Sequence, residues 1–116
     1  MKMLHVTIHT ASFEEELKFY QEIVGLTIVN DMRKIGRDLV FLANAEGETC
    51  IEIIRDSAVS DAGNQALSIG FHTDDVAQKK AELEALGLET SQIISPAPGV
   101  QFFYVKDPAG VRIQFI

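Results

Sequence analysis

The chain contains no tryptophan, one cysteine and three prolines among its 116 residues. A single cysteine, Cys50, excludes an intrachain disulfide and a zinc cluster built from cysteines. No apolar run approaches the ~20 residues that a membrane-spanning helix needs. The N-terminal stretch MKMLHVTIHT turns polar too soon for a signal peptide. We therefore expect a cytoplasmic protein that does not contact a membrane.

Positive charge is also scarce, because ten Lys and Arg residues stand against 17 Asp and Glu, for a formal net charge of −7. The acidic residues are spread along the chain, and no basic stripe offers a surface to phosphates. This balance argues against nucleic-acid binding and says little about small ligands. What is abundant is hydrophobic sequence, at 47%, which is enough for a single domain with a core over residues 1–116.

One pattern occurs twice in the sequence. Residues 5–26, HVTIHTASFEEELKFYQEIVGL, and residues 68–88, SIGFHTDDVAQKKAELEALGL, both read as a strand, a helix and a glycine stop. The matching positions are 63 apart in the strands and 62 apart at the stops, as in Val6/Ile69, His9/His72 and Gly25/Gly87. The second helix is therefore expected to be one residue shorter than the first.

Three further strands are predicted after each helix from apolar alternation. They lie near residues 26–30, 37–43 and 49–56 in the first half, and near 89–95, 100–106 and 111–116 in the second. The sequence is thus typical of an α+β protein with two βαβββ modules in tandem, related by pseudo-twofold symmetry.

The helix starts and the connection between the modules can also be read locally. Ser12 followed by Glu15 fits a capping box, and Asp75 followed by Gln78 fits a second cap. The stretch SAVSDAGNQA, residues 57–66, is the predicted linker. Module one then covers about residues 1–56, and module two about residues 67–116.

Four strands share the feature of one polar face. These faces carry His5, Thr7 and His9; Cys50, Glu52, Ile54 and Asp56; Ser68, Gly70 and His72; and Arg112, Gln114 and Ile116. If the modules pack by pseudo-twofold symmetry, the faces line one concavity of a cupped mixed sheet. The alternative is an ordinary solvated sheet face. His5 and Glu52 favour the pocket, because imidazole and carboxylate are metal-ligand types.

The segments LHVTIHT, FYQEIVGLTI, IEII and VKDPAGVRIQFI, in this order, resemble the signatures of the vicinal oxygen chelate superfamily. This superfamily includes glyoxalase I, the bleomycin and fosfomycin resistance proteins and the extradiol dioxygenases. The last segment is the most specific, because it is an Asp-Pro-x-Gly turn into the final strand. The resemblance implies the glyoxalase/bleomycin-resistance fold, a small-molecule ligand and a homodimer.

The resemblance also implies a metal site. In glyoxalase-like members four side chains hold a divalent ion, and the matching positions here are His5, Glu52, Ser68 and Gln114. Ser68 stands where those members have His and is not expected to be a ligand, whereas Gln114 stands where they usually have Glu. The implied catalytic positions are Glu52 and Gln114. The implied ion is Ni, Zn, Co or Mn, weakly bound or absent.

The other polar-face residues are interpreted as substrate contacts, namely Thr7, His9, Asp56, His72 and Arg112. His9 and Asp56 match family positions that touch the substrate, and His72 is the repeat-mate of His9. Arg112 is a candidate anion contact because its guanidinium group matches a carboxylate. The alternatives are solvated strand ends for the histidines and an ion pair with Asp56 or Glu52 for Arg112.

Two classes of function follow from this interpretation. The first is a metal-assisted lyase or isomerase that acts on a small thiol adduct or hydroxy-acid derivative, supported by His5 and Glu52 and weakened by Ser68 and Gln114. The second is a metal-free protein that sequesters a small molecule, for which the acidic charge suits a cationic ligand. The lack of tryptophan counts against the second class.

Overall fold

The computed structural model describes residues 1–61 and 66–116. The chain divides into two compact units, Met1–Asp61 and Ala62–Ile116. The predicted linker, 57–66, spans this boundary, and its residues 62–65 lie outside the described residues. Within the described ranges, no helix has both the length and the apolar character needed to cross a membrane. That the two modules form a single domain stays a prediction.

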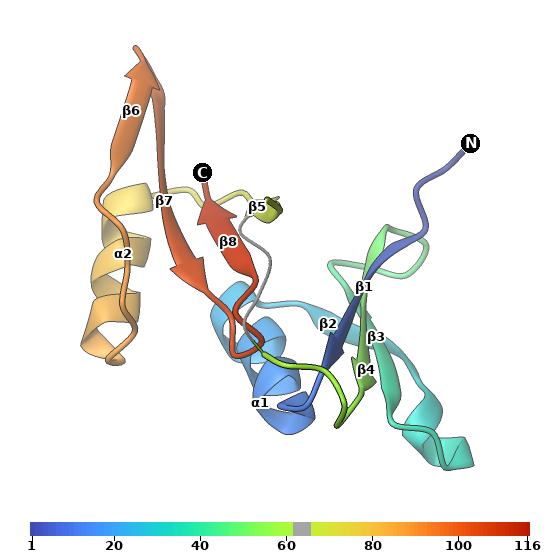
Figure 1. The fold of residues 1–116 in the computed structure, drawn as a ribbon. Helices are drawn as coiled ribbons and strands as arrows, with labels where there is room; N and C mark the ends of the chain where they lie inside the picture. Colours follow the sequence, from blue (N-terminus) through green and yellow to red (C-terminus); the bar gives the residue numbers. More distant parts are fainter. Residues whose placement is uncertain (62–65) are drawn as a thin grey trace. The chain divides into compact units, whose positions relative to one another are not determined.

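The first unit is a four-stranded mixed sheet with one α-helix and two short helical segments of other types. Its elements are β1 (His5–Thr10), α1 (Phe13–Lys18), a π-helical turn (Phe19–Val24), β2 (Thr27–Asp31), a 3-10 helix (Met32–Ile35), β3 (Leu39–Ala43) and β4 (Cys50–Arg55). The strand order is β1-β4-β3-β2, and β1 and β4 are parallel while the other pairs are antiparallel (Figure 1).

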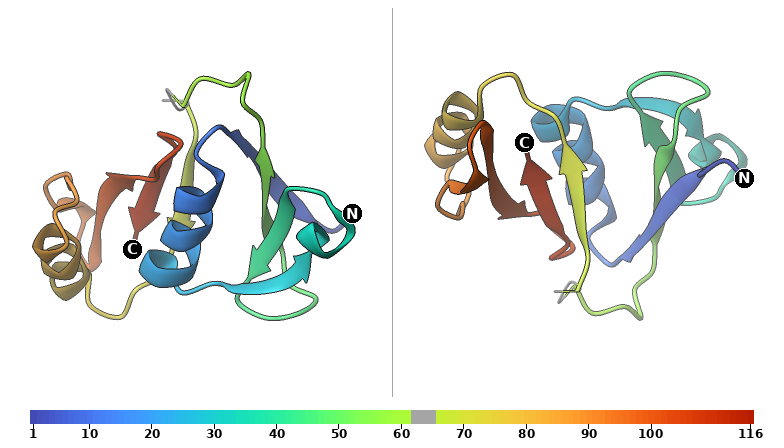
Figure 2. Two further views of the ribbon diagram at one scale, coloured as in Figure 1. Left: turned by 90° about the horizontal axis from the view of Figure 1, so that it is seen from below. Right: turned by 90° about the horizontal axis from the view of Figure 1, so that it is seen from above.

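The second unit repeats this topology. It contains β5 (Ser68–Phe71), α2 (Val76–Ala85), β6 (Ile94–Ala97), β7 (Val100–Lys106) and β8 (Arg112–Phe115). The strand order β5-β8-β7-β6, with β5 and β8 parallel, matches the first unit strand for strand. Helix α2 lies beside β7, as both views of Figure 2 show. The prediction of an α+β chain with two βαβββ modules is therefore confirmed.

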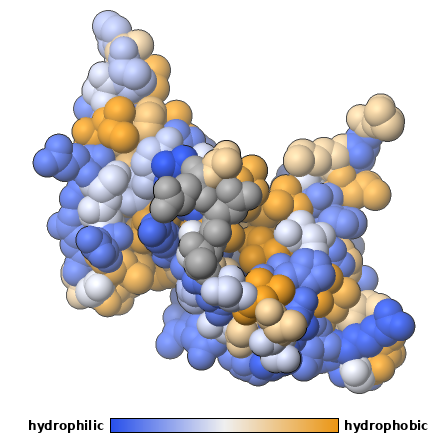
Figure 3. Space-filling model, viewed as in Figure 1, coloured by the Kyte–Doolittle hydropathy of each residue, from blue (hydrophilic) through white to orange (hydrophobic). Residues whose placement is uncertain are grey.

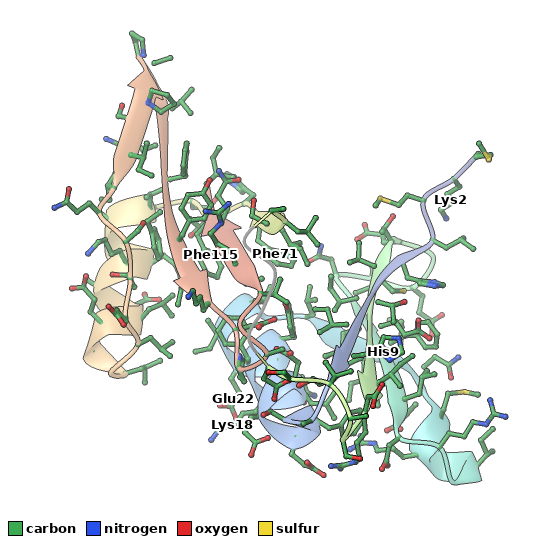
Figure 4. The ribbon with its side chains drawn as sticks, viewed as in Figure 1. Lys2, His9, Lys18, Glu22, Phe71 and Phe115 are labelled. Atoms are coloured by element: carbon green, nitrogen blue, oxygen red, sulfur yellow. The ribbon has the colours of Figure 1, made fainter. Side chains whose placement is uncertain are left out.

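Each sheet buries the apolar face that the alternation predicted. In the first unit Val40, Leu42 and Ile53 are fully buried, and α1 contacts β4. In the second unit Phe103 and Phe115 stack at 5.6 Å between ring centroids, and the Phe71 ring lies 6.5 Å from that of Phe115 (Figure 4). Burial of these large side chains removes the apolar faces from water.

The helical stretch of the first unit, Phe13–Val24, has 12 residues against ten in α2, so it is longer by two residues where the repeat offset predicted one. Its C-terminal half, Phe19–Val24, is π-helical, and the wider turn takes in one more residue than an α-helical turn. Both helices then end at a glycine with positive φ, Gly25 and Gly87, each at 86°. This left-handed geometry favours glycine, which has no Cβ to clash with the carbonyl.

Two local predictions were wrong. Ser12 makes no capping hydrogen bond to its helix; its hydroxyl donates to Asp61 Oδ2 at 2.6 Å instead, so the capping box with Glu15 does not form. The strand predicted near 89–95 is β6, Ile94–Ala97, preceded by an isolated bridge from Thr90 to Val105. The second predicted cap is confirmed, because Asp75 Oδ1 accepts from the Gln78 amide at 2.9 Å.

Exposed apolar side chains lie next to one another along the N-terminal segment and around β6 (Figure 3), and single ones are exposed at Ile35, Leu67, Leu86 and Ile116. The N-terminal ones are Met1, Met3 and Leu4, and those around β6 are Ile93 and Ile94. Strand β6 is an edge strand, and Pro96 within it removes one N–H that another strand would need.

Asp61 anchors the segment after β4 to the start of α1. Its carboxylate accepts hydrogen bonds from Ser12 Oγ, Thr10 Oγ1 at 2.9 Å and the Ala11 amide at 3.3 Å. The hydrogen bond from Ser12, followed by the one from Thr10, lowers the pKa of Asp61 below its usual 3.8. Folding therefore favours the ionised carboxylate. The resulting stability is present above pH 3.8 and is lost as the pH falls through the folded-state pKa.

Replacing Asp61 by Asn should lower the free energy of unfolding at pH 7 by about 1 kcal/mol, the typical worth of such hydrogen bonds. The difference from the wild type should shrink as the pH falls from 3.8 through the lower folded-state pKa, because Asp61 is protonated first in the unfolded chain and then in the folded protein. Urea unfolding at a series of pH values measures this. A difference that stays constant down to acid pH would contradict the role assigned to the charge.

Candidate functional site

The candidate site in the first unit is built by the parallel pair β1 and β4. Their register sets Thr7 beside Glu52, and residues paired in this way share a face of the sheet. Thr7 Oγ1 donates to Glu52 Oε1 at 2.5 Å, and His5 Nε2 lies 3.5 Å from the same oxygen. On the opposite face, the Arg55 guanidinium covers the Phe13 ring of α1. Glu52 therefore faces away from the helix, as the alternation predicted.

Glu52 is a buried carboxylate, with 8% of its surface exposed. A carboxylate removed from water needs hydrogen-bond donors to offset the loss of hydration. In the described part of the chain, both of its contacts, to Thr7 and His5, use Oε1. The His5 ring in turn meets the edge of the Phe41 ring at 5.7 Å. The site thus presents one carboxylate oxygen that is held and one that is available for chemistry.

The His5 and Glu52 pair fits part of a divalent metal site. Two ligands of a tetrahedral zinc ion, each about 2.1 Å from it, lie about 3.4 Å apart, and His5 Nε2 and Glu52 Oε1 are 3.5 Å apart. A pair is not a complete donor set. Over residues 1–61 and 66–116, no group of three or more His, Cys, Asp or Glu side chains is arranged to hold a metal ion. A third donor would have to be of another type, such as an amide oxygen.

The second unit places Ser68 and Gln114 on one face of its own parallel pair. Ser68 pairs with Arg112 and Gly70 pairs with Gln114 in the register of β5 and β8. Gln114 Oε1 lies over Gly70, 3.0 Å from where a Cβ at that residue would be. The absence of a side chain at Gly70 thus makes room for the Gln114 amide. Both Ser68 and Gln114 are neutral, and Ser68 is exposed.

The predicted substrate-contacting residues take different partners in the two units. His9 Nδ1 lies 3.6 Å from Asp56 Oδ2, and both side chains are partly exposed; His9 projects from β1 in Figure 4. His72, its repeat-mate, instead lies 3.2 Å from Asp74 and is largely exposed. The Arg112 guanidinium covers the Tyr104 ring at 4.7 Å. The structure joins His5, Thr7 and Glu52 in one cluster and His9 with Asp56 in another.

A cavity of about 370 Å³ in the second unit was missed by reasoning from the sequence. It lies where the segment after α2 runs beside β7, and it is lined by Leu88, Glu89, Thr90, Ser91, Tyr104, Val105, Lys106 and Arg112. Lys106 could have indicated this cavity from the sequence. It lies two residues after Tyr104 in β7, so both side chains are on the same face of the strand.

The chain resembles known proteins over its whole length. Residues 2–115 match the model of the Glyoxalase/Bleomycin resistance protein/Dioxygenase superfamily. A lactoylglutathione lyase of Haemophilus influenzae is 25% identical, over all of this chain and 92% of that protein. Leishmania major glyoxalase I has a similar structure, with a TM-score of 0.80, 24% identity and coverage of 100% of this chain and 86% of the other. The fosfomycin resistance protein FosX of Listeria monocytogenes has a TM-score of 0.79 at 16% identity, covering 99% and 91% of the two chains.

The hydrogen bond from Thr7 should stabilise the folded first unit. Thr7→Val keeps the shape of the side chain but removes the donor to a buried carboxylate, so the free energy of unfolding should fall by about 1–3 kcal/mol. Thr7→Ser keeps the hydroxyl and should lose less than half of that. Urea unfolding of the three proteins at pH 7 gives the comparison. Equal losses for Val and Ser would mean that the methyl group, rather than the hydrogen bond, matters.

Proposed function

Because the chain belongs to the Glyoxalase/Bleomycin resistance protein/Dioxygenase superfamily, we propose that it is a glyoxalase-like lyase or isomerase. Its substrate class is a small thiol adduct or hydroxy-acid derivative. The 25% identical lactoylglutathione lyase supports this class of substrate. The observation that carries the proposal is the buried Glu52 carboxylate, held by Thr7 and adjacent to His5.

Glu52 is the residue that moves the proton in this proposal. Its Oε1 is occupied by the Thr7 hydroxyl, so Oε2 takes a proton from one carbon of the substrate and returns it to the adjacent carbon. The low exposure of Glu52 keeps water away from the carboxylate, so the proton passes between substrate and protein. The Thr7 hydrogen bond prevents rotation of the carboxylate during both transfers.

A divalent ion is the cofactor of the proposal, held by His5, Glu52 and the amide oxygen of Gln114. When bound, such an ion polarises the substrate oxygens and stabilises negative charge that develops on them. Ser68 is a poor donor in the fourth position. A neutral amide is a weaker ligand than a carboxylate, so weak binding of Ni²⁺, Zn²⁺, Co²⁺ or Mn²⁺ is expected.

The remaining polar-face residues are proposed to contact the substrate: Thr7, His9, Asp56, His72 and Arg112. Thr7 would contact the substrate while its hydroxyl donates to Glu52. His9 lies further along the same face of β1, where its ring is close to Asp56. The homodimer implied by the family stays part of the proposal, as does the cytoplasmic location.

A second candidate function is metal-free binding of a small molecule. The observation that favours it is the neutral pair Ser68 and Gln114 at two of the four metal positions. In the described residues, His, Cys, Asp and Glu side chains form no group of three suited to a metal. A protein of this kind would need the polar faces for recognition only.

Glu52→Gln tests the proposed chemistry. With methylglyoxal and glutathione as the probe, and Ni²⁺, Zn²⁺, Co²⁺ or Mn²⁺ added, formation of lactoylglutathione should fall by about 10²–10⁴-fold in the variant, the usual contribution of a proton-transferring group. Glu48→Gln, an exposed neighbour on the same segment, is the matched control and should keep the wild-type rate. A wild-type protein without turnover in any of the four ions would favour the binding function.

Ser68→His combined with Gln114→Glu tests the metal positions. The double variant supplies two His and two Glu, and each restored ligand should tighten binding by about tenfold or more. Calorimetric titration with Ni²⁺ or Zn²⁺ measures the gain, and adding His5→Ala should abolish it. A folded double variant that binds no more tightly than the wild type would show that these positions do not act together.

A further inference from the structure

The second unit carries two cations on one face of its sheet, in a chain with a net charge of −7. Lys106 and Arg112 are direct partners in the antiparallel register of β7 and β8, so their side chains lie on the same face of the sheet. Both line the cavity of about 370 Å³ at this end of the unit. Two positive charges that share a cavity wall favour an anion inside it.

The Arg112 guanidinium lies over an aromatic ring. Tyr104 lies two residues before Lys106 on β7, and its ring carries the guanidinium 4.7 Å above its centroid. A cation over an aromatic face is attracted by the ring, and a guanidinium group is the side chain whose shape matches a carboxylate. The Arg112 guanidinium thus offers one half of an anion site.

The segment that follows α2 forms another part of the cavity wall. The Ser91 hydroxyl accepts from the Tyr104 amide at 2.8 Å, and the Thr90 hydroxyl donates to Glu84 at 2.8 Å. These bonds tie the segment to β7 and to α2 and leave its hydroxyls occupied by protein groups. Recognition in the cavity therefore falls to the two cations, the Tyr104 ring and the apolar Leu88.

The charge balance of the cavity selects the class of anion. Glu89 also lines it, so the three charged side chains Glu89, Lys106 and Arg112 sum to one positive charge. In the described part of the chain, the ion pairs of the second unit do not include Lys106. A singly charged carboxylate matches this balance, and an apolar or aromatic body attached to it matches Tyr104 and Leu88.

We infer that the cavity between β7, β8 and the segment after α2 binds the carboxylate end of a small organic acid, with Lys106 and Arg112 as its anion contacts. The inference deepens the proposed function, since Arg112 belongs to the proposed substrate contacts. It adds Lys106, Tyr104 and the cavity itself as the subsite that selects acidic ligands. It assigns no step of the chemistry to this subsite.

Benzoate is the probe, because it combines a single carboxylate with an aromatic body. Titration of the full-length ¹⁵N-labelled protein at pH 7, without added metal, should give saturable amide shifts at Thr90, Ser91, Lys106 and Arg112. Lys106→Gln should weaken benzoate about fivefold and Arg112→Gln about tenfold. Glu89→Gln should tighten it about twofold, because it removes the repelling charge. Lys34→Gln, a charge change in the first unit, should leave the affinity unchanged.

Two further ligands separate the possible sources of binding. Benzyl alcohol, which has the ring without the charge, should produce no saturable shifts at these amides. Inorganic phosphate should bind more weakly than benzoate. Equal binding of benzyl alcohol, tighter binding of phosphate, or a benzoate affinity that ignores both Lys106→Gln and Arg112→Gln would overturn the inference.

The subsite and the proposed chemistry fail separately. Glu52→Gln should bind benzoate as the wild type does, because the probe needs neither Glu52 nor a metal. If Glu52→Gln loses turnover and the wild type does not bind benzoate, the proposed function stands and the proposed subsite is wrong. If the wild type shows no turnover but binds benzoate in a way that depends on Lys106, the proposed subsite stands and the proposed lyase chemistry is wrong.

Discussion

The parallel pairing of the first and last strand in each unit is the constraint on which the rest of the structure depends. A parallel pair cannot be closed by a hairpin, so the helix and two strands between its members must cross over. In each unit the same crossover brings β1 to β4 or β5 to β8. The register then decides which side chains meet on the polar face.

The same register position carries different chemistry in the two units. Thr7 faces Glu52 in the first unit, and the corresponding pair in the second is Gly70 with Gln114. In the first, a hydroxyl donates to a buried carboxylate. In the second, a glycine leaves room for a neutral amide. The two units thus share the backbone arrangement, but only the first has a charged group, Glu52, at this position.

The polar faces of the two units also differ in sign. The first carries the carboxylates Glu52 and Asp56, each near a histidine. The second carries Lys106 and Arg112 over a cavity with an aromatic wall. An acidic face suits cations and proton transfer, whereas a basic face suits the acidic end of a ligand. In the two proposals, the carboxylate that moves the proton belongs to the first unit, and the cations that bind the acidic end of the ligand belong to the second.

The sequence by itself determined the features that depend on neighbouring residues. The period-two alternation predicted the buried and polar faces, including the side of the sheet on which Glu52 lies, because side chains alternate along any strand. The Asp75 cap and the glycine stops were readable because they are local backbone chemistry.

Only the tertiary structure decided the partners that lie far apart in the chain. Ser12 binds Asp61 rather than its own helix, and Gln114 lies over Gly70. The cavity beside Lys106 exists because the segment after α2 runs along β7. Such partners are chosen by strand order and register, which residue spacing along one segment does not encode.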